Sequence, residues 1–253
     1  MITLAGSLRN YPGFPPFVAH ATMQDLFGSE MSSVYSSTLA KLPEYAKTIA
    51  AQNGGASTAA EQEVLLKTQL DLLWAGNTPT SEIVPGVFGK FTGVAFWPLQ
   101  PFSRGSIHIN STDMIAPPGI DAKFLQLEFD VTVAVATAKF ARKVLTTPPL
   151  SGVVNTTTLT PSFDLVPEDA SDDVWLKWMK SPGSIGPNYH PLGTCAMLPK
   201  EKGGVVNNDF KVYGTSNVRV VDLSVIPLQV AGHSMAPLYG VAEWASRKIK
   251  NSQ

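Results

Sequence analysis

The spacing of apolar side chains predicts two consecutive helices in the first third of the chain. Apolar residues recur at helical intervals through residues 32–51, and a Gly-Gly pair at 54–55 ends that run. A second helical pattern starts in residues 57–61, whose Ser-Thr-Ala-Ala-Glu string is typical of a helix start, and it continues to Trp74. Pro43 lies inside the first run, so we expect it to kink that helix or to divide it in two.

The apolar periodicity changes in the middle of the chain. Two β-rich runs, 93–99 and 105–110, flank a Pro-Phe-Ser-Arg segment. Helical spacing returns over residues 121–145 and again over 164–178, where acidic residues at the start suit a helix N-terminus. A short helix is also expected between residues 18 and 28. The pattern therefore predicts a mixture of helices and strands.

The C-terminal segment has a third pattern. Residues 203–206 predict a turn, residues 218–222 a buried strand, and residues 237–249 a final helix. A short strand followed by a loop and a helix is the geometry of ligand sites in α/β folds, where the helix N-terminus faces the ligand. A ligand is therefore expected in this segment.

Composition narrows the possible classes of protein. The chain has 253 residues, of which 44% are hydrophobic and 15% charged, so it can bury a sizeable core and is too poor in charge for a disordered protein. The net charge is −1 and the basic residues are scattered, which gives a polyanion no binding patch. Residues 1–9 do not resemble a signal peptide, and no stretch approaches the roughly 20 apolar residues of a membrane span. We expect a soluble chain with one large domain or two small ones.

The single cysteine and two sequons have both functional and ordinary interpretations. Cys195 cannot form a disulfide within this chain. It follows His190 closely, which suggests a nucleophile, but no base and orienting group are evident, and a buried free thiol is the commoner state. The triplets that begin at Asn110 and Asn155 would accept glycans if the chain were secreted, and chance is the alternative.

Histidines carry the candidate chemistry. His20 stands in a helix-like pattern and His108 in a strand-like one, so we interpret both as structural. His190 lies in a loop dense in turn formers, and His233 directly precedes the final helix, where functional residues are common. If the two rings meet, one can take a hydroxyl proton while the other holds the oxygen. Because no side chain accepts a hydride from carbon, that chemistry needs a flavin or a nicotinamide.

A chained set of motifs resembles the glucose–methanol–choline (GMC) flavin oxidoreductases, and within them the fungal glucose oxidases and FAD glucose dehydrogenases. The motifs are Asn-Tyr-His-Pro-Leu-Gly-Thr-Cys-Ala-Met at 188–197, Gly-Gly-Val-Val at 203–206, Val-Tyr-Gly at 212–214, Val-Arg-Val-Val-Asp at 218–222, and His233. The Pro-Phe-Ser-Arg-Gly string at 101–105, with Trp97 before it, also fits the family's substrate-domain sheet. The resemblance covers most of the chain and is densest from Tyr189 onward.

The resemblance implies an FAD cofactor and a role for several residues. His190 matches the family's catalytic base and His233 its partner histidine. The positions that match the family's flavin contacts are Val221, Asp222, His233, Ser234 and Met235. The positions that match its substrate pocket are Trp97, Asn188 and Tyr189, although core packing is an alternative for the two aromatic residues. No metal site is expected.

This chain departs from the family pattern in two places, and the departures change the expected substrate and the expected binding of FAD. Sugar-oxidising relatives carry an arginine two positions before the Asn-Tyr-His run, where this chain has Gly186, so a less polar alcohol becomes at least as plausible a substrate as glucose. The chain also lacks a Gly-x-Gly-x-x-Gly motif after a strand, which in the family holds the FAD pyrophosphate.

These features predict the C-terminal part of an FAD-dependent alcohol oxidoreductase with an α+β fold. We expect an antiparallel substrate-domain sheet with helices in residues 1–185, and the C-terminal segment of an FAD-binding, Rossmann-like domain in residues 186–253. The N-terminal half of the FAD domain is expected to be missing, so the chain alone should bind FAD weakly or not at all. That half, an alcohol, and an electron acceptor such as oxygen are the expected partners, and secretion is the expected location. The alternatives are a GMC relative with non-redox cyclase or lyase chemistry and a catalytically silent truncated chain.

Overall fold

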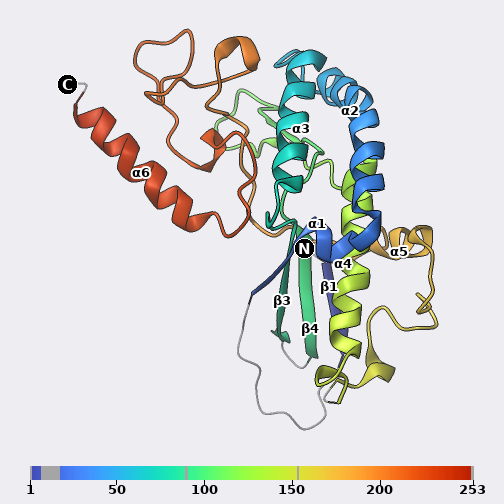
Figure 1. Cartoon of the computed structure of the whole chain (residues 1–253). Coiled ribbons are helices and arrows are strands. Elements are labelled where there is room, and N and C mark those ends of the chain that lie inside the picture. The colour runs from blue at the N-terminus through green and yellow to red at the C-terminus, as the bar shows by residue number, and fades with distance from the viewer. Residues whose placement is uncertain (1, 7–17, 89–90, 153, 252–253) are drawn as a thin grey trace. The chain divides into compact units, whose positions relative to one another are not determined.

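A computed structural model describes residues 2–6, 18–88, 91–152 and 154–251 of the chain (Figure 1). The chain forms two compact units. The first unit contains Met1–Val34, Leu73–Leu99 and Glu128–Asn188, and the second contains Tyr35–Leu72, Gln100–Leu127 and Tyr189–Gln253. Neither unit is one continuous stretch of sequence.

The first unit is built on a four-stranded antiparallel sheet. Its strands are β1 (Ile2–Gly6), β2 (Ala19–Ala21), β3 (Ser81–Phe88) and β4 (Phe91–Pro98), in the order β1-β4-β3-β2. Strands β3 and β4 pair without interruption, from Ser81 opposite Pro98 to Phe88 opposite Phe91. Val94 and Phe96 of β4 are fully buried.

Helix α4 (Glu128–Thr146) packs against strands β3 and β4 (Figure 1). Phe129, Val133, Ala141 and Leu145 are buried at multiples of four residues, which places them along one helix face. Thr137, on the same face, shares a buried hydrogen bond of 2.7 Å with the Ser81 hydroxyl of β3. The helix and the sheet therefore enclose a core with its polar groups satisfied at this point.

Shorter elements complete the first unit. They are α1 (Met23–Phe27), α5 (Asp172–Met179) and the 3-10 turns η1 (Gly28–Glu30), η2 (Leu150–Gly152) and η3 (Thr156–Thr158). Helix α1 begins with a capping box, in which the hydroxyl of Thr22 accepts from the Asp25 amide and the Asp25 carboxylate accepts from the Thr22 amide. The Asp25 carboxylate accepts from the Thr22 hydroxyl as well as from the Thr22 amide, and these two hydrogen bonds, the amide's first, lower the pKa of Asp25.

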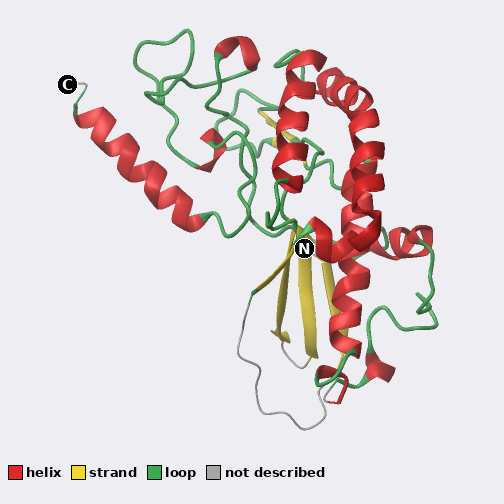
Figure 2. Cartoon of the chain, in the orientation of Figure 1, coloured by secondary structure: helices red, strands yellow, loops and turns green. Residues whose placement is uncertain are grey.

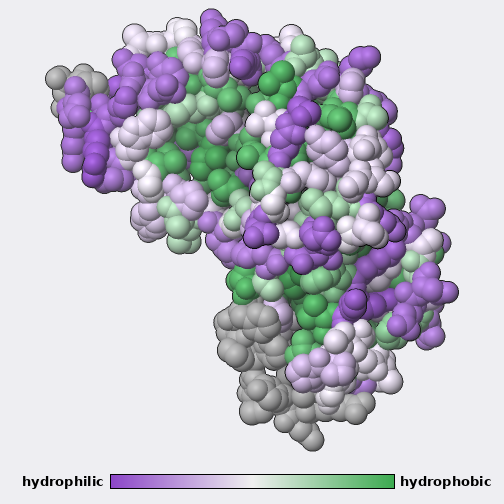
Figure 3. All heavy atoms as spheres, viewed as in Figure 1, coloured by the Kyte–Doolittle hydropathy of each residue, from purple (hydrophilic) through white to green (hydrophobic). Residues whose placement is uncertain are grey.

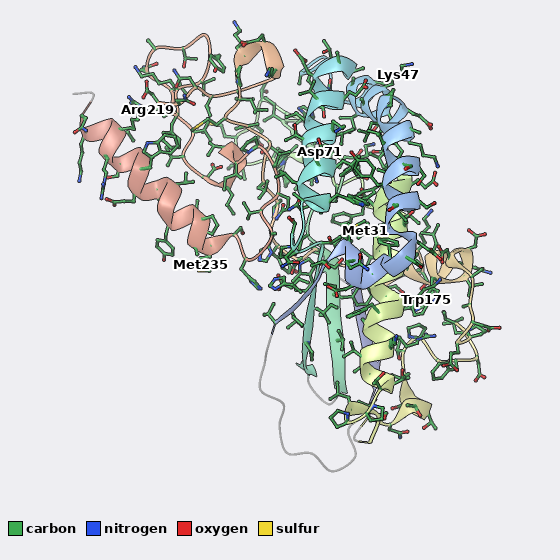
Figure 4. The ribbon with its side chains drawn as sticks, viewed as in Figure 1. Met31, Lys47, Asp71, Trp175, Arg219 and Met235 are labelled. Carbon is green, nitrogen blue, oxygen red and sulfur yellow. The ribbon has the colours of Figure 1, made fainter. Side chains whose placement is uncertain are left out.

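A buried arginine holds the segment before α5 against α4. The guanidinium of Arg142 donates to the carbonyl of Val166 at 2.7 Å and to that of Pro161 at 3.1 Å. Its central carbon lies 4.2 Å from the ring centroid of Trp175, which projects from α5 (Figure 4), and 5.1 Å from that of Phe163. Burial lowers the pKa of Arg142, and the charge of Glu168 opposes that shift.

Two helices enter the second unit. Helices α2 (Met31–Gln52) and α3 (Ala59–Trp74) are linked there by a hydrogen bond from the Tyr35 hydroxyl to the Asp71 carboxylate. Thr58 and Glu61 cap the start of α3 reciprocally, at 2.6 and 3.3 Å. Lys67 also donates to Asp71, and this hydrogen bond is the main cause of that carboxyl's lowered pKa.

A buried polar network joins α3 to the next segment. The side chain of Gln69 donates to the carbonyls of Gln100 and Pro101 and accepts from Arg104 at 2.7 Å. Arg104 also donates to the Pro101 carbonyl at 2.7 Å. Beyond this network lies a separate two-stranded antiparallel sheet of β5 (Ser106–His108) and β6 (Gly119–Asp121).

Loops and short turns make up most of the rest of the second unit (Figure 2). Its regular elements are η4 (Lys200–Lys202), η5 (Leu223–Val225) and the final helix α6 (Met235–Lys250). A small core holds them together and consists of Val206, Phe210, Val225 and Ala245, with Trp244 of α6 packed edge-on against Phe210. Lys248 of α6 donates to Asp209, which lowers the pKa of that carboxyl.

The mixed helix and antiparallel-sheet fold predicted from the sequence is confirmed, and several predicted elements need correction. Helix α2 is one continuous helix through Pro43, which lies on its exposed side, so Pro43 does not divide it in two, whereas the alternative of a kink at Pro43 stays a prediction. Helix α4 starts at Glu128 rather than at 121, because Lys123 and Leu125 adopt positive φ angles that end regular structure there. Helix α5 starts at Asp172 rather than at 164.

Two other predictions for single segments were also wrong. His20 lies in strand β2 and not in a helix. Residues 218–222 form no strand within the described part of the chain, although Arg219 makes an isolated bridge to Lys211. Val218 and Val221 are exposed rather than buried, since nothing in the second unit covers them.

Candidate functional site

The second unit brings the two predicted histidines together. The ring centroids of His190 and His233 lie 5.2 Å apart, and the ring planes meet at 71°. Both side chains come from loops, and each loop is fastened to an element of regular structure. The meeting of the two imidazoles, which their sequence spacing could not show, is the central feature of the candidate site.

The loop that carries His190 is fixed by main-chain hydrogen bonds to η5 and its neighbours. The amide of Gly193 donates to the Leu223 carbonyl, that of Cys195 to the Ser224 carbonyl at 2.9 Å, and that of Met197 to the Val225 carbonyl at 2.8 Å. The loop after His190 therefore runs beside residues 223–225 of η5, and the three hydrogen bonds form a main-chain ladder between them.

Tyr189 and Gly193, on either side of His190, have unusual backbone conformations. Tyr189 has a φ of 58°, which few residues other than glycine adopt, and its side chain is 83% exposed. Gly193 has a φ of 87°, and a Cβ there would lie 3.3 Å from the Ile226 carbonyl oxygen. Strained backbone of this kind is concentrated at functional sites, because the surrounding structure must hold it in place.

The second histidine stands at the start of helix α6. Gly232, with a φ of 148°, turns the chain just before it, and Ser234 is buried at the N-cap position. The side chain of Ser234 makes no capping hydrogen bond to this helix N-terminus, and Met235 is 69% exposed (Figure 4). The first amides of a helix have no partner within it, and they carry the positive end of its dipole.

The residues present fit the edge of a site for a cofactor that carries or develops negative charge, such as FAD. The exposed start of α6 offers backbone donors at Met235 and Ala236 where negative charge would be stabilised. Asp222 is exposed and uses one carboxylate oxygen to accept from the Ser224 amide at 2.8 Å, as the N-cap of η5. Val221 beside it is exposed. All of the predicted flavin-contacting residues lie in the second unit.

The predicted substrate residues are divided between the units. Trp97 lies near the end of β4 and Asn188 is the last residue of the first unit, whereas Tyr189 belongs to the second. The place of Trp97 and Asn188 beside the histidines stays a prediction. Sequence reasoning missed Glu82 of β3, a fully buried carboxylate opposite Trp97 in the sheet, whose side chain lies 3.6 Å from His20. A lone glutamate inside an apolar strand was the signal that could have indicated it.

The two remaining candidate residues, Cys195 and His108, have positions that need no catalytic role. Cys195 is partly buried and free, and its backbone belongs to the ladder beside η5. His108 is exposed at the end of β5. Across the described ranges, no group of three or more His, Cys, Asp or Glu side chains could hold a metal ion. Nor does any described helix have the length and apolar character needed to cross a membrane.

Comparison with known proteins identifies the family. The sequence profile of the C-terminal region of GMC oxidoreductases matches residues 101–242, which include both histidines. The chain belongs to the GMC oxidoreductases. This confirms the resemblance found in the motifs from Asn188 onward.

Individual relatives agree with this assignment. A glucose oxidase-like protein of Humicola fuscoatra, fsoC, is 39% identical over 92% of this chain and 39% of its own length. A fungal aryl-alcohol oxidase structure shares 26% identity and a TM-score of 0.71 over 93% of this chain. An FAD-dependent oxidoreductase of Chaetomium thermophilum has the same fold, with a TM-score of 0.79 at 24% identity.

This chain corresponds to only part of those relatives. It covers 38% of the length of each of the two solved chains and 39% of the Humicola protein. About three-fifths of the length of each relative therefore lies outside the part that this chain covers, and we call that remainder the complementary GMC portion.

Proposed function

We propose that this chain supplies the substrate-side histidines of an FAD-dependent enzyme that oxidises an alcohol to a carbonyl compound. The observation that carries the proposal is the contact between His190 and His233, with ring centroids 5.2 Å apart, at an exposed helix start. Two imidazoles at this separation can hold one hydroxyl group between them. FAD, when bound, supplies the acceptor for the hydride that leaves the alcohol carbon.

We assign the proton transfer to His190. A ring nitrogen of His190 takes the hydroxyl proton, so that the oxygen becomes the carbonyl oxygen of the product as the hydride leaves. His190 is partly buried in a loop held by the ladder beside η5, which keeps the ring in one place. A fixed ring matters because a misplacement of about 1 Å can reduce the rate about a hundredfold.

His233 is assigned to hold the oxygen. Its ring donates a hydrogen bond to the substrate oxygen while the proton is on its way to His190. The backbone beside it, at Ser234 and Met235, starts α6 and presents amides that stabilise negative charge on a neighbouring cofactor. Val221 and Asp222 complete the proposed cofactor-contacting set on this chain.

The proposed substrate is a primary or secondary alcohol that is less polar than a sugar. Gly186 stands where sugar-oxidising relatives carry an arginine, and no atom lies within 4 Å of the Cβ position there, so this position supplies no guanidinium to bind hydroxyl groups. Trp97 and Tyr189 add aromatic surface, and Asn188 adds an amide. Names among the relatives, glucose oxidase-like and aryl-alcohol oxidase, cover both polar and apolar alcohols.

Secretion, glycosylation and the final electron acceptor also stay proposals. If the chain is glycosylated, Asn155 is the better acceptor of the two, because its amide oxygen accepts from the Thr157 hydroxyl and amide and leaves the amide nitrogen free to react. The amide of Asn110, in contrast, lies so close to Gly119 that a Cβ there would be 2.6 Å from its nitrogen. We propose oxygen or another small acceptor as the final oxidant.

The function is tested in a chimera that joins the complementary GMC portion of the Humicola relative to this chain. His190→Ala should lower the rate of alcohol-dependent flavin reduction by about a hundredfold or more, because general base catalysis contributes about that much. His233→Ala should reduce the rate less while raising KM, since it removes a hydrogen bond to the substrate oxygen. The measurement is anaerobic stopped-flow absorbance of the flavin.

Lys177→Ala is the control, because Lys177 is exposed on α5 in the first unit and belongs neither to the histidine pair nor to the β5–β6 hairpin. It should reduce flavin as fast as the unmodified chimera. Unchanged reduction in His190→Ala would exclude His190 as the base. Turnover without flavin reduction would favour the non-redox alternative, and a chimera that binds FAD but turns over no alcohol would favour a silent chain.

A second measurement concerns the chain alone. We expect the purified 253-residue chain to carry little or no flavin, because its contacts to the cofactor come from one side. Its visible spectrum checks this directly. A stoichiometric flavin absorbance band would contradict the need for the complementary GMC portion.

A further inference from the structure

The β5–β6 region of the second unit exposes an unusual amount of apolar side chain. We define the apolar hairpin surface by its six exposed large hydrophobic residues: Ile107, Ile109, Met114, Ile115, Ile120 and Phe124. Ile109 is 89% exposed and Ile120 is 73% exposed. Single exposed apolar residues need no explanation, but six within 18 consecutive residues are typical of a surface that another chain or domain covers.

The exposure arises from an ordered hairpin. Ile107 and Ile120 are direct partners in the antiparallel pairing of β5 with β6, so they lie side by side on one face. Gly105 starts the hairpin so close to the other strand that a Cβ would come within 2.4 Å of the Asp121 carbonyl oxygen. The loop between the strands is closed by hydrogen bonds, including one from the Ile115 amide to the Asp113 carboxylate at 3.0 Å.

The base of the hairpin is anchored firmly. Arg104 immediately before it belongs to the buried network with Gln69. After it, the Leu127 amide donates to the Ser103 hydroxyl at 3.1 Å, and Gln126 donates to Gln52 of α2 at 2.8 Å. An anchored two-stranded sheet with one apolar face is marginally stable unless a further layer packs on that face.

A second exposed apolar surface occurs in the same unit. Met235 and Tyr239 lie four residues apart on α6 and are both largely exposed, and Val218 and Val221 lie exposed in the loop before that helix. In Figure 3, hydrophobic residues gather at the surface next to α6, over the loops that precede it. The unit that carries the proposed cofactor contacts is thus also the unit with uncovered apolar surface.

We propose that the apolar hairpin surface is the docking site for the complementary GMC portion. This portion is the occupant we favour because about three-fifths of the length of the matched relatives lies outside the part that this chain covers, and the hairpin lies inside the region 101–242 that the family profile matches. The hairpin therefore belongs to the shared family domain and is not an addition peculiar to this chain. The proposal rests on the proposed function only in naming that portion as the bearer of the rest of the FAD site.

A second copy of the chain is the competing occupant. A symmetric dimer would bury the same hairpin face from both copies around a twofold axis. It would leave the apolar residues on α6 to be covered separately, whereas a domain of the size of the complementary GMC portion can cover both surfaces at once. The two occupants differ in a measurable way, since only one of them makes the isolated chain dimeric.

The test measures association between this chain and the separately produced complementary GMC portion of the Humicola relative, by sedimentation velocity. Ile109→Asp with Ile120→Asp should weaken association by at least about tenfold, because two buried apolar contacts are replaced by carboxylates. Ile109→Thr with Ile120→Thr keeps β-branched side chains, so it preserves the hairpin and should weaken association by several-fold. Leu165→Asp is the control, because Leu165 is a leucine of the first unit that is also largely exposed, at 60%, and its replacement should leave association unchanged.

Several results would overturn the proposal. One is association of both hairpin variants within twofold of the unmodified chain, with circular dichroism showing them folded, and another is no association of the unmodified chain. A third is a dimer of the isolated chain that the hairpin variants abolish. Failure of the proposed function is distinguishable, because it would appear as unchanged flavin reduction in the His190→Ala chimera, whereas His190→Ala should associate normally whether or not His190 is the base.

Discussion

The first unit (unit one) buries most of its large apolar side chains in its own core, whereas the second unit (unit two) leaves many of its own exposed. In unit one, α4 and the four-stranded sheet enclose a core that includes Phe96, Val133 and Trp175. Among the described residues, its exposed large apolar side chains are Val18 and Leu165, while all the others belong to unit two. Unit two buries side chains of α2 and α3, such as Leu42, Leu66 and Leu70, but its C-terminal part has only a small core around Phe210 and Val225 and consists mostly of loops and turns.

The difference suggests how the two parts contribute to a GMC oxidoreductase. Unit one supplies a closed scaffold, in which helix propensity, strand pairing and burial agree. Unit two carries the histidine pair, the strained Tyr189 and the exposed start of α6. Each of these features costs folding free energy unless the surrounding structure holds it in place. Catalytic residues commonly lie in such less stable regions because they must contact ligands and partners.

Replacing Arg142 should have the largest effect on stability, and it probes whether unit one is independent. Arg142→Leu keeps the apolar bulk but leaves the carbonyls of Val166 and Pro161 without this donor, and it removes the cation from the rings of Trp175 and Phe163. We expect a loss of about 3 kcal/mol, since each unsatisfied buried carbonyl costs about 1–3 kcal/mol. Thermal unfolding followed by near-ultraviolet circular dichroism, to which all five tryptophans of the chain contribute, gives the loss.

The control is Arg247→Ala, which removes an exposed arginine that pairs with Glu243 one helical turn away. Such pairs contribute only a few tenths of a kcal/mol, so the unfolding temperature should barely change. Hydrogen exchange then sharpens the comparison. If Arg142→Leu speeds exchange in residues 128–188 and equally in residues 189–253, the two units unfold together and the contrast between them is false.

A second change acts on unit two through its backbone. Gly204 lies so close to residues 198 and 199 that a Cβ would stand 1.9 Å from the Leu198 carbonyl oxygen. Gly204→Ala must therefore move backbone next to the His190 loop, and we expect a loss of about 2–3 kcal/mol, as for other overpacked sites. Thermal unfolding followed by far-ultraviolet circular dichroism gives the loss.

Gly186→Ala is the control for this change, because no atom lies within 4 Å of its Cβ position. Its unfolding temperature should match that of the unmodified chain. Hydrogen exchange in α5 of unit one should also stay slow in Gly204→Ala at temperatures where unit two has unfolded. Equal destabilisation by the two alanine substitutions would contradict the steric explanation.

How far the sequence predicted the fold depended on the range of the interactions involved. Helices α2, α3 and α6 were predicted within a few residues, because their periodicity, caps and glycine stops are local. Strands β2 and β3 were missed, since β2 has three residues and β3 contains Pro85 and Gly86, which weaken the strand pattern. The supposed strand at 218–222 was wrong because a run of valines indicates burial only where another layer covers it.

For the candidate site, the sequence identified the residues but not the contacts that hold them. The motifs identified His190 and His233, but only the fold shows that η5 and the loop after His190 form the ladder that holds one of them. The buried Glu82 was missed because its partner His20 lies in another strand, far away in sequence. Side chains that meet across a sheet depend on strand register, which composition and periodicity do not specify.

The smallest expected effect depends on pH and concerns the attachment of α6 to unit two. The ammonium group of Lys248 donates to Asp209 at 2.9 Å and lowers the pKa of that carboxyl. A group whose pKa is lower in the folded state stabilises that state above its unfolded-state pKa of about 3.9, and the contribution is lost as the pH falls through the folded-state value.

We therefore expect the unfolding temperature of the isolated chain to fall slightly more between pH 5 and pH 3 than that of Asp209→Asn, which has no proton to take up. Lys248→Gln should behave like Asp209→Asn, because it removes the charge that shifts the carboxyl. The pair is largely exposed, so added salt should reduce the difference by screening. Identical slopes for the three proteins at low salt would mean that this pair does not help to hold α6, and that the small core around Phe210 holds α6 without it.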